Sequence, residues 1–108
     1  MGTDIDLERA AKIARRNDIF RRRGFGFMLT SSIAKIPDLL DIIGEVRMYT
    51  DFDEYNDPHH EHDFGLILWY GKKIIWKIDY YDRDLEYACD PLARNCQRVL
   101  TVMLAGEH

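Results

Sequence analysis

Apolar residues recur at helical spacing in two segments of the first half of the chain. Between residues 4 and 20 the stripe consists of Leu7, Ala10, Ala11 and Ala14. The second stripe consists of Leu39, Ile42, Ile43 and Val46. Both follow the i, i+3, i+4, i+7 rule of a helix with one buried face. Three arginines and a glycine at residues 21–24 suit a helix end, and Pro37 suits a first turn. We therefore predict helices over residues 4–20 and from Pro37 onward.

The second half of the chain carries the pattern of a β-hairpin. Two apolar and aromatic runs, His62–Trp69 and Lys73–Tyr81, flank a turn around Gly71. The run Phe25–Thr30 predicts a further short strand. Near the C-terminus, Asp90-Pro91 has the cap and the first-turn proline of a last helix. The buried stripe of that helix would consist of Leu92, Cys96, Val99, Leu100 and Met103.

These elements follow one another in the order α-β-α-β-β-α. A chain of 108 residues is long enough for one hydrophobic core and too short for two. The economical arrangement is a three-stranded, mainly antiparallel sheet with the helices packed on one face. The sequence thus predicts a single α+β domain over residues 1–108.

The faces of the predicted hairpin depend on its turn, because a shift of one residue moves every side chain to the opposite face. A three-residue turn at residues 70–72 gathers one apolar face from Phe64, Leu66, Leu68, Ile74, Trp76 and Ile78. A two-residue turn would instead place Lys77 among leucines and bury its charge without benefit. We therefore predict the three-residue turn, with Trp76 in the core and with Trp69 and Tyr81 on the outer face.

Under this register Asp63, Lys77 and Asp79 converge around Gly65, whose missing side chain leaves room for a ligand. Two facing carboxylates share a proton, bind a metal ion or are neutralised by a neighbouring cation. One interpretation is a divalent-metal-dependent hydrolase or nuclease with Asp63, Lys77 and Asp79 as catalytic residues. The simpler interpretation is a Lys77 salt bridge with solvated acids on an open sheet face.

The run of residues 57–63 (DPHHEHD) is dense in residue types that bind metal ions. Its spacing matches neither a zinc protease helix nor a calcium loop. A metal site would use His62, Asp63 and Asp79, and a solvated acidic loop is the more common explanation. No cofactor is therefore predicted, and a bound divalent ion stays an open alternative.

Charge is distributed unevenly along the chain. Residues 1–36 carry eight Lys/Arg and four Asp/Glu, residues 37–63 carry one and nine, and residues 64–108 carry six of each. The balances of +4, −8 and 0 give the net charge of −4. Such a chain either complements itself internally or offers an acidic face to a basic partner. The candidate binding residues are Asp53, Glu54, Asp57, His59, Glu61, Trp69, Tyr81 and Asp82.

Other features narrow the class of protein. The acidic, polar N-terminus and the shortness of every apolar run predict a cytoplasmic protein without membrane contact. Two cysteines do not make a disulfide framework, and we expect Cys96 to be a buried thiol. Residues 23–27 (RGFGF) match the opening of an RNA-recognition signature, but too little chain precedes them for that fold. Phe25 and Phe27 are therefore predicted core residues, and direct nucleic-acid binding is the less favoured partner class.

The blocks at residues 62–65 (HDFG) and 76–82 (WKIDYYD) resemble an uncharacterised bacterial family of small proteins of unknown function. Its members are often encoded on plasmids, integrated elements and phages. The similarity covers most of the chain, including residues 56–59 and 98–105. The resemblance implies no established activity, only a context of mobile DNA, where small acidic proteins frequently disable host defence.

The resemblance and the acidic segment 37–63 together favour a non-enzymatic anti-defence inhibitor, similar to an anti-CRISPR protein, that imitates phosphate charge. Its partner would be a host defence protein or nucleoprotein complex. The alternative is the metal-dependent hydrolase, so whether the chain is an enzyme stays open, as does its oligomeric state.

Overall fold

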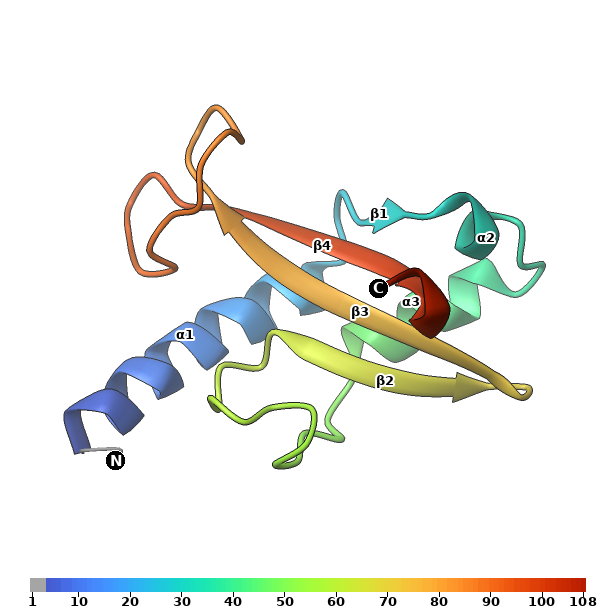
Figure 1. The fold of residues 1–108 in the computed structure, drawn as a ribbon, viewed down its shortest axis with the longest axis horizontal. Coiled ribbons are helices and arrows are strands. Elements are labelled where there is room, and N and C mark those ends of the chain that lie inside the picture. Colours follow the sequence, from blue (N-terminus) through green and yellow to red (C-terminus); the bar gives the residue numbers. More distant parts are fainter. Residues whose placement is uncertain (1–3) are drawn as a thin grey trace.

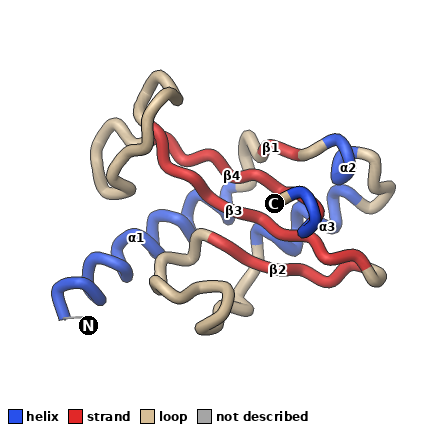
Figure 2. The backbone as a smooth tube through the Cα atoms, in the orientation of Figure 1, coloured by secondary structure: helices blue, strands red, loops and turns tan. Residues whose placement is uncertain are grey.

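The computed structural model describes residues 4–108 as a four-stranded sheet with α1 and α3 on one face (Figure 1). In chain order the elements are α1 (Asp4–Arg23), β1 (Met28–Leu29), α2 (Ser31–Ala34), α3 (Leu39–Arg47), β2 (Phe64–Trp69), β3 (Lys72–Tyr81), β4 (Gln97–Leu104) and the 3-10 helix η1 (Ala105–Glu107). The strands lie in the order β1-β4-β3-β2, with β1 parallel to β4 and the other pairs antiparallel. Figure 2 shows η1 in front of the sheet, opposite α3.

The mixed α+β fold, both N-terminal helices and the hairpin are confirmed, although the sheet has four strands rather than three. α1 continues to Arg23, three residues beyond the predicted end. Its buried residues recur at helical spacing: Ala10, Ile13, Ala14, Asn17 and Arg21. In α3, Ile42 and Val46 are fully buried and join the core that the sheet forms.

The predicted C-terminal helix is wrong. Residues 82–96 hold no helix, and β4 takes the central position between β1 and β3. Its β-branched residues favour a strand, and alternation sends Leu100 and Val102 into the core. A short apolar run fits both the 3.6-residue period of a helix and the two-residue period of a strand, so its pattern alone could not distinguish the two. Cys96 is accordingly a half-buried free thiol before β4, not a residue of a helix.

The first strand is shorter than predicted and lies at the edge of the sheet. Only Met28 and Leu29 pair, parallel to the middle of β4. Phe25 is 78% exposed, so its assignment to the core is wrong. Phe27 is half-buried and packs against the core as expected.

The hairpin turns through two residues, so the predicted three-residue turn is wrong. Tyr70 and Gly71 have φ angles of 46° and 82°, the combination that a type I′ turn requires. Trp69 pairs with Lys72, and each residue of β2 therefore faces the side opposite to the predicted one. The core face carries Gly65, Ile67, Ile74, Trp76 and Ile78, and the outer face carries Phe64, Leu66, Leu68, Ile75, Lys77 and Asp79.

Trp76 explains why β2 adopts this register. Its side chain is fully buried, as predicted, and an added Cβ on Gly65 would collide with its indole ring. The ring of Tyr49 closes the same space, 5.4 Å from Trp76 between centroids. The room beside Gly65 is thus filled by two aromatic rings and is not left for a ligand. Lys77 is not buried in this register, since its side chain on the outer face stays 33% exposed.

Candidate functional site

Lys77 and Asp79 form an ion pair on the outer face of β3. Lys77 Nζ lies 3.1 Å from Asp79 Oδ2, with the side chains 33% and 38% exposed. A pair this exposed contributes little to stability. The Asp63 carbonyl accepts a hydrogen bond from Ile78 N at 2.8 Å, which continues the pairing with β3 one residue before β2 begins. Asp63 and Asp79 together line a hollow at this end of β3, while the charge of Lys77 is directed to Asp79.

Asp63 nevertheless has an unusual environment. Burial raises the pKa of its carboxyl group, and the nearby carboxylates of Asp57 and Asp79 raise that pKa further. Burial also raises the pKa of Glu61. Among the side chains that the structure describes, no three from His, Cys, Asp or Glu gather in an arrangement that could hold a metal ion. The predicted ligands His62, Asp63 and Asp79 thus form no such group in the described part of the chain.

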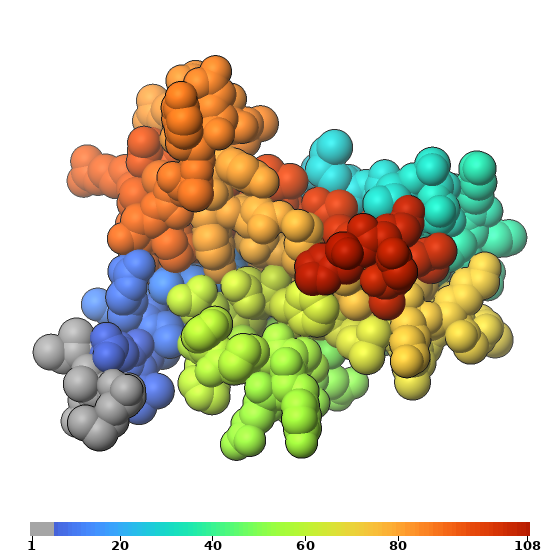
Figure 3. Space-filling view, in the orientation of Figure 1, coloured from blue at the N-terminus to red at the C-terminus, as the bar shows by residue number. Residues whose placement is uncertain are grey.

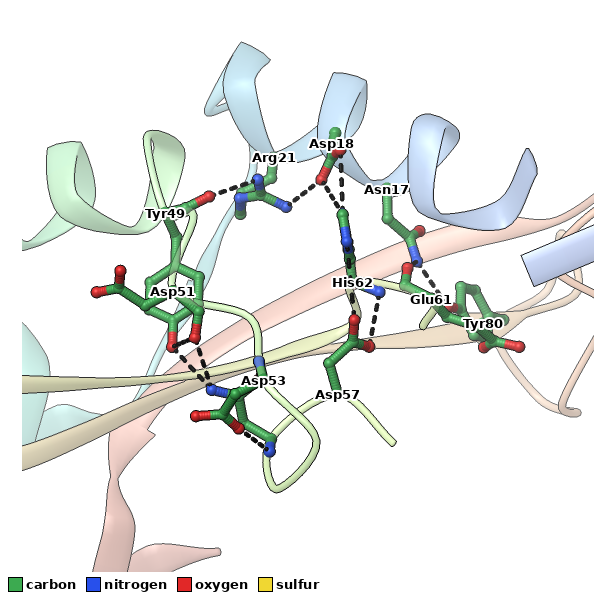
Figure 4. A network of polar contacts seen from close by, with 11 residues as sticks. Asn17, Asp18, Arg21, Tyr49, Asp51, Asp53, Asp57, Glu61, His62 and Tyr80 are labelled. Atoms are coloured by element: carbon green, nitrogen blue, oxygen red, sulfur yellow. Dashed lines mark hydrogen bonds and ion pairs between the residues drawn. The ribbon is translucent and has the colours of Figure 1, made fainter. Parts of the chain in front are cut away.

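His62 is held between two carboxylates (Figure 4). Its Nδ1 lies 3.0 Å from Asp18 Oδ1, and its Nε2 lies 3.7 Å from Asp57 Oδ2. The imidazole ring stacks on Phe52 with 3.9 Å between centroids. Asp57 is 3% exposed and also accepts a hydrogen bond from His62 N at 3.0 Å. His62 thus joins the loop to α1, and Asp57 holds His62 in place. Because Asp57 is buried, it does not lie on an exposed binding surface, contrary to the prediction.

Arg21 is the buried centre of this network. Its guanidinium donates to Asp18 Oδ1 at 3.0 Å and to the Tyr49 carbonyl at 3.1 Å. The guanidinium carbon also lies 5.4 Å and 5.1 Å from the ring centroids of Phe52 and Trp76, and the faces of aromatic rings attract a positive charge at this distance. Burial lowers the pKa of the Arg21 guanidinium, and the hydrogen bond to Asp18 opposes that shift. The network links α1 to Tyr49 and to the rings beneath it, although Arg21 Nε is buried without a hydrogen-bond partner among the described residues.

A second network joins α1 to the sheet. Asn17 is fully buried, and its Nδ2 donates to the Glu61 carbonyl at 2.9 Å and to the Tyr80 hydroxyl at 2.7 Å. Arg98 Nε donates to Asn17 Oδ1 at 2.6 Å, and its guanidinium lies 5.3 Å from the Tyr80 ring. Burial raises the pKa of Tyr80. Sequence reasoning missed both networks; the available signal was that Asn17 and Arg21 continue the spacing of the buried alanines.

The loop before β2 is stiffened by its own side chains. Asp53 Oδ1 accepts hydrogen bonds from the N–H groups of Tyr55 and Asn56 at 2.8 Å and 2.9 Å. Asn56 Nδ2 donates to the Asp51 carbonyl at 2.9 Å and to the Tyr49 hydroxyl at 3.2 Å. The loop, yellow-green in Figure 3, projects at the lower edge of the molecule. These bonds hold the backbone of the loop and the carboxylate of Asp53 in place.

The loop and the free edge of β2 form one surface, which we call the β2 surface: Glu45, Asp51, Asp53, Glu54, Leu66 and Leu68. All of these except Glu54 line a groove of about 420 Å³, and Glu54 lies beside it in the loop. Leu66 and Leu68 are 40% and 70% exposed. None of the four carboxylates forms an ion pair with any side chain of residues 6–108. Sequence reasoning missed both leucines here, because the wrong register assigned them to the core.

The remaining candidate residues are scattered. His59 is exposed, whereas Glu61 is half-buried. Trp69 packs partly against the core, contrary to its predicted outer position. Tyr81 lies on the outer face as predicted and is half-buried. Asp82 Oδ1 accepts two backbone hydrogen bonds at 3.1 Å within its own loop. These residues form no common site with the β2 surface.

Residues 29–107 match the family described as "Protein of unknown function (DUF3768)". Because the match covers most of the chain, the chain belongs to this family. The resemblance to a family of unknown function is thus confirmed. No curated protein and no solved structure matches the chain. None of the helices that the structure describes is both long and apolar enough to span a membrane.

Proposed function

We propose that this chain is a non-enzymatic binding protein that docks a basic partner protein on the β2 surface. The observation that carries the proposal is the position of two exposed leucines, Leu66 and Leu68, beside four carboxylates without a cationic partner in the described residues. Exposed apolar side chains with a polar rim are typical of protein interfaces. The leucines would supply the apolar centre, and the carboxylates would attract and orient the partner.

The free edge of β2 favours an extended segment of that partner. Along an antiparallel pair, residues alternate between those whose backbone groups bond the partner strand and those whose groups point away from it. Ile78 N bonds the Asp63 carbonyl, so counting along β2 from residue 63 shows that the backbone groups of Leu66 and Leu68 point away from β3. The Tyr49 hydroxyl already accepts a hydrogen bond from Leu66 N at 3.1 Å. The backbone of Leu68 remains directed to the free edge, where a short extended segment would add main-chain hydrogen bonds.

The mobile-element context implied by the family resemblance suggests the class of partner. A host defence protein or nucleoprotein complex carries a Lys/Arg surface that normally holds phosphate. The β2 surface would inhibit such a target by occupying that surface with carboxylates. We therefore favour an anti-defence, anti-CRISPR-like role.

The alternative function is a metal-dependent hydrolase that uses Asp63, Lys77 and Asp79. The geometry favours it less, because Lys77 pairs with Asp79 and, in the described part of the chain, no three His, Cys, Asp or Glu side chains gather to hold a metal ion. The binding proposal therefore stands alone.

Charge reversal on the β2 surface tests this proposal. The side chains of Asp51 and Glu54 are exposed and make no hydrogen bond within the described residues, so the double variant Asp51→Lys/Glu54→Lys should fold normally. Asp84→Lys/Glu86→Lys is the matched control, because it makes the same charge change on the exposed 82–96 loop. Each protein is immobilised and mixed with a nuclease-treated cell lysate, and bound proteins are quantified.

The wild-type chain and the control should retain the same basic proteins and release them at high salt, since exposed charge pairs are screened. The β2 variant should retain them at least tenfold less. Equal retention by the β2 variant and the wild-type chain would contradict the proposal.

A further inference from the structure

The outer face of α1 carries a row of cations opposite its buried face. These residues, which we call the α1 stripe, are Lys12, Arg15, Arg16, Ile19, Arg22 and Arg23, all exposed. At 3.6 residues per turn they lie roughly 180° around the helix from the buried residues of α1. The one carboxylate between residues 12 and 23 is Asp18, which is half-buried and engaged with Arg21 and His62. Residues 12–23 therefore place no carboxylate on the stripe, and Glu8, one turn before Lys12, forms no ion pair with residues 6–108.

The cations of the α1 stripe are also free of other acidic partners in the described part of the chain. Arg16 donates to the Leu92 carbonyl at 3.2 Å, a contact that leaves its positive charge uncompensated. The four that form no ion pair with residues 6–108 and no side-chain hydrogen bond are Lys12, Arg15, Arg22 and Arg23. Arg9, by contrast, lies outside the stripe and pairs with Asp90 at 3.0 Å. The stripe thus presents positive charge over about 16 Å of helix.

The α1 stripe forms a ridge between two grooves. Arg15 and Arg22 line one groove of about 390 Å³, between α1 and the loop before β2. Arg16 and Arg23 line the other, of about 320 Å³, beside the start of β4. Ile19, 46% exposed, lies between the two rows. All six residues of the ridge are exposed, so it is accessible from solvent.

We propose that the α1 stripe binds the phosphate backbone of duplex DNA, with α1 lying along the major groove. The major groove of B-form DNA is about 12 Å wide and admits one α-helix. Each row of arginines would then face the phosphates of one strand. The guanidinium group suits this role because its N–H donors match two phosphate oxygens at once. Such contacts position a protein on DNA without reading its sequence.

The composition of the α1 stripe favours nucleic acid over an acidic protein. A protein interface is built around apolar and aromatic side chains, and Ile19 is the single apolar residue of the stripe. Protein–DNA interfaces are more polar and strongly positive. The net charge of −4 does not oppose contact at the stripe, because charges farther away than about 8 Å are largely screened at physiological salt.

This inference does not depend on the β2 surface, which lies on other elements and has the opposite charge. The two surfaces would suit a nucleoprotein, whose protein is basic and whose nucleic acid is anionic. A chain with both could contact the two components of one complex.

Fluorescence anisotropy with a labelled DNA duplex of about 20 base pairs tests the proposal, with NaCl varied from about 50 to 200 mM. The test variant is Arg15→Gln/Arg22→Gln/Arg23→Gln. The matched control is Lys72→Gln/Lys73→Gln/Arg83→Gln, which removes three exposed cations elsewhere. Circular dichroism verifies that each variant is folded.

The wild-type chain should bind the duplex saturably, with log affinity falling steeply against log salt. Because each phosphate contact contributes about 0.9 to that slope, the stripe variant should lose most of the slope and at least about tenfold in affinity. The control should stay within about twofold of the wild type. An RNA duplex of equal length should bind more weakly, because its deep, narrow major groove does not admit a helix.

Four results would each overturn the proposal. They are no saturable binding at the lowest salt, equal loss of affinity in the control variant, equal or tighter binding of the RNA duplex, and tighter binding of polyglutamate than of DNA. The last result would identify an acidic protein as the partner of the stripe.

Discussion

At the scale of single residues, Gly65 and Trp76 determine how β2 sits in the sheet. Gly65→Ala places a methyl group against the Trp76 indole and 2.7 Å from Cε1 of Tyr49, two buried rings that cannot move aside. Overpacking of this kind costs about 1–3 kcal/mol, so we expect a fall of that size in the free energy of unfolding. Urea denaturation measures it.

Gly44→Ala in α3 is the control, since an added Cβ there meets nothing within 4 Å. It should leave the free energy of unfolding unchanged or raise it by up to about 1 kcal/mol, because alanine favours a helix. Equal stability of the two variants would contradict the described packing.

Asp63 should make stability depend on pH. Its pKa is raised above 3.8 in the folded protein, chiefly by burial, so the folded state favours the neutral carboxyl group. Ionisation of Asp63 therefore lowers the free energy of unfolding. This loss is absent below the pKa that Asp63 has in the unfolded chain and grows as pH rises through its pKa in the folded protein. Asp63→Asn, which is always neutral, should therefore be more stable than the wild type at neutral pH, with the difference shrinking toward about pH 4.

Urea denaturation across this pH range measures the difference for each protein. Asp84→Asn is the matched control, because it makes the same substitution at an exposed position. If the difference in free energy of unfolding between Asp63→Asn and the wild type widens on acidification, the pKa of Asp63 is not raised in the folded protein.

Residue type alone could not foresee what holds α1 in place. Asn17 and Arg21 belong to types that are mostly exposed, yet both are fully buried here. Their partners come from separate elements: Phe52 from the loop, and Trp76 and Tyr80 from β3. Only the folded arrangement brings these groups together, whereas the burial of Trp76 followed from its strand pattern.

At the scale of elements, the β2–β3 turn offers a stabilising substitution. Tyr70 occupies a left-handed conformation, with φ of 46°, while its side chain is 87% exposed. Asn tolerates this conformation better, and Asn-Gly is the preferred pair of a type I′ turn. Tyr70→Asn should therefore raise the free energy of unfolding by about 0.5–1 kcal/mol.

Thermal or urea unfolding measures this change, with Tyr70→Ala as the control for loss of the ring. If Tyr70→Asn is no more stable than Tyr70→Ala, the two-residue turn is not the conformation in solution.

The long periodic helices and the hairpin were predictable from spacing alone, whereas β4 was not. Leu92 to Met103 satisfies a helical stripe, and Asp90-Pro91 resembles a helix start. The strand prevails because β4 pairs on both sides, with β1 and with β3, which no local pattern reveals. The predicted hairpin register was wrong because it too depended on a contact between strands that the local pattern does not show. Gly65 makes room for the Trp76 ring and not for a ligand.

At the scale of the whole molecule, the uneven charge of the sequence becomes two separate surfaces. The acidic segment 37–63 supplies the carboxylates of the β2 surface, as its balance of −8 suggested. The structure decides which of them are free, because Asp57 is buried in the loop while Asp51 and Glu54 are exposed. The basic N-terminal segment likewise becomes the α1 stripe only after α1 buries its opposite face.

Site-specific photo-cross-linking tests most directly whether the β2 surface binds a protein. The photoreactive residue p-benzoylphenylalanine replaces Leu68 on the β2 surface or, as the control, Leu85 in the 82–96 loop; these side chains are 70% and 56% exposed. Each protein is irradiated in a nuclease-treated lysate. We predict a discrete adduct with a basic protein at Leu68, lost on adding Asp51→Lys/Glu54→Lys and absent at Leu85. Adducts of equal yield at both positions, or none at Leu68, would contradict a docking site on β2.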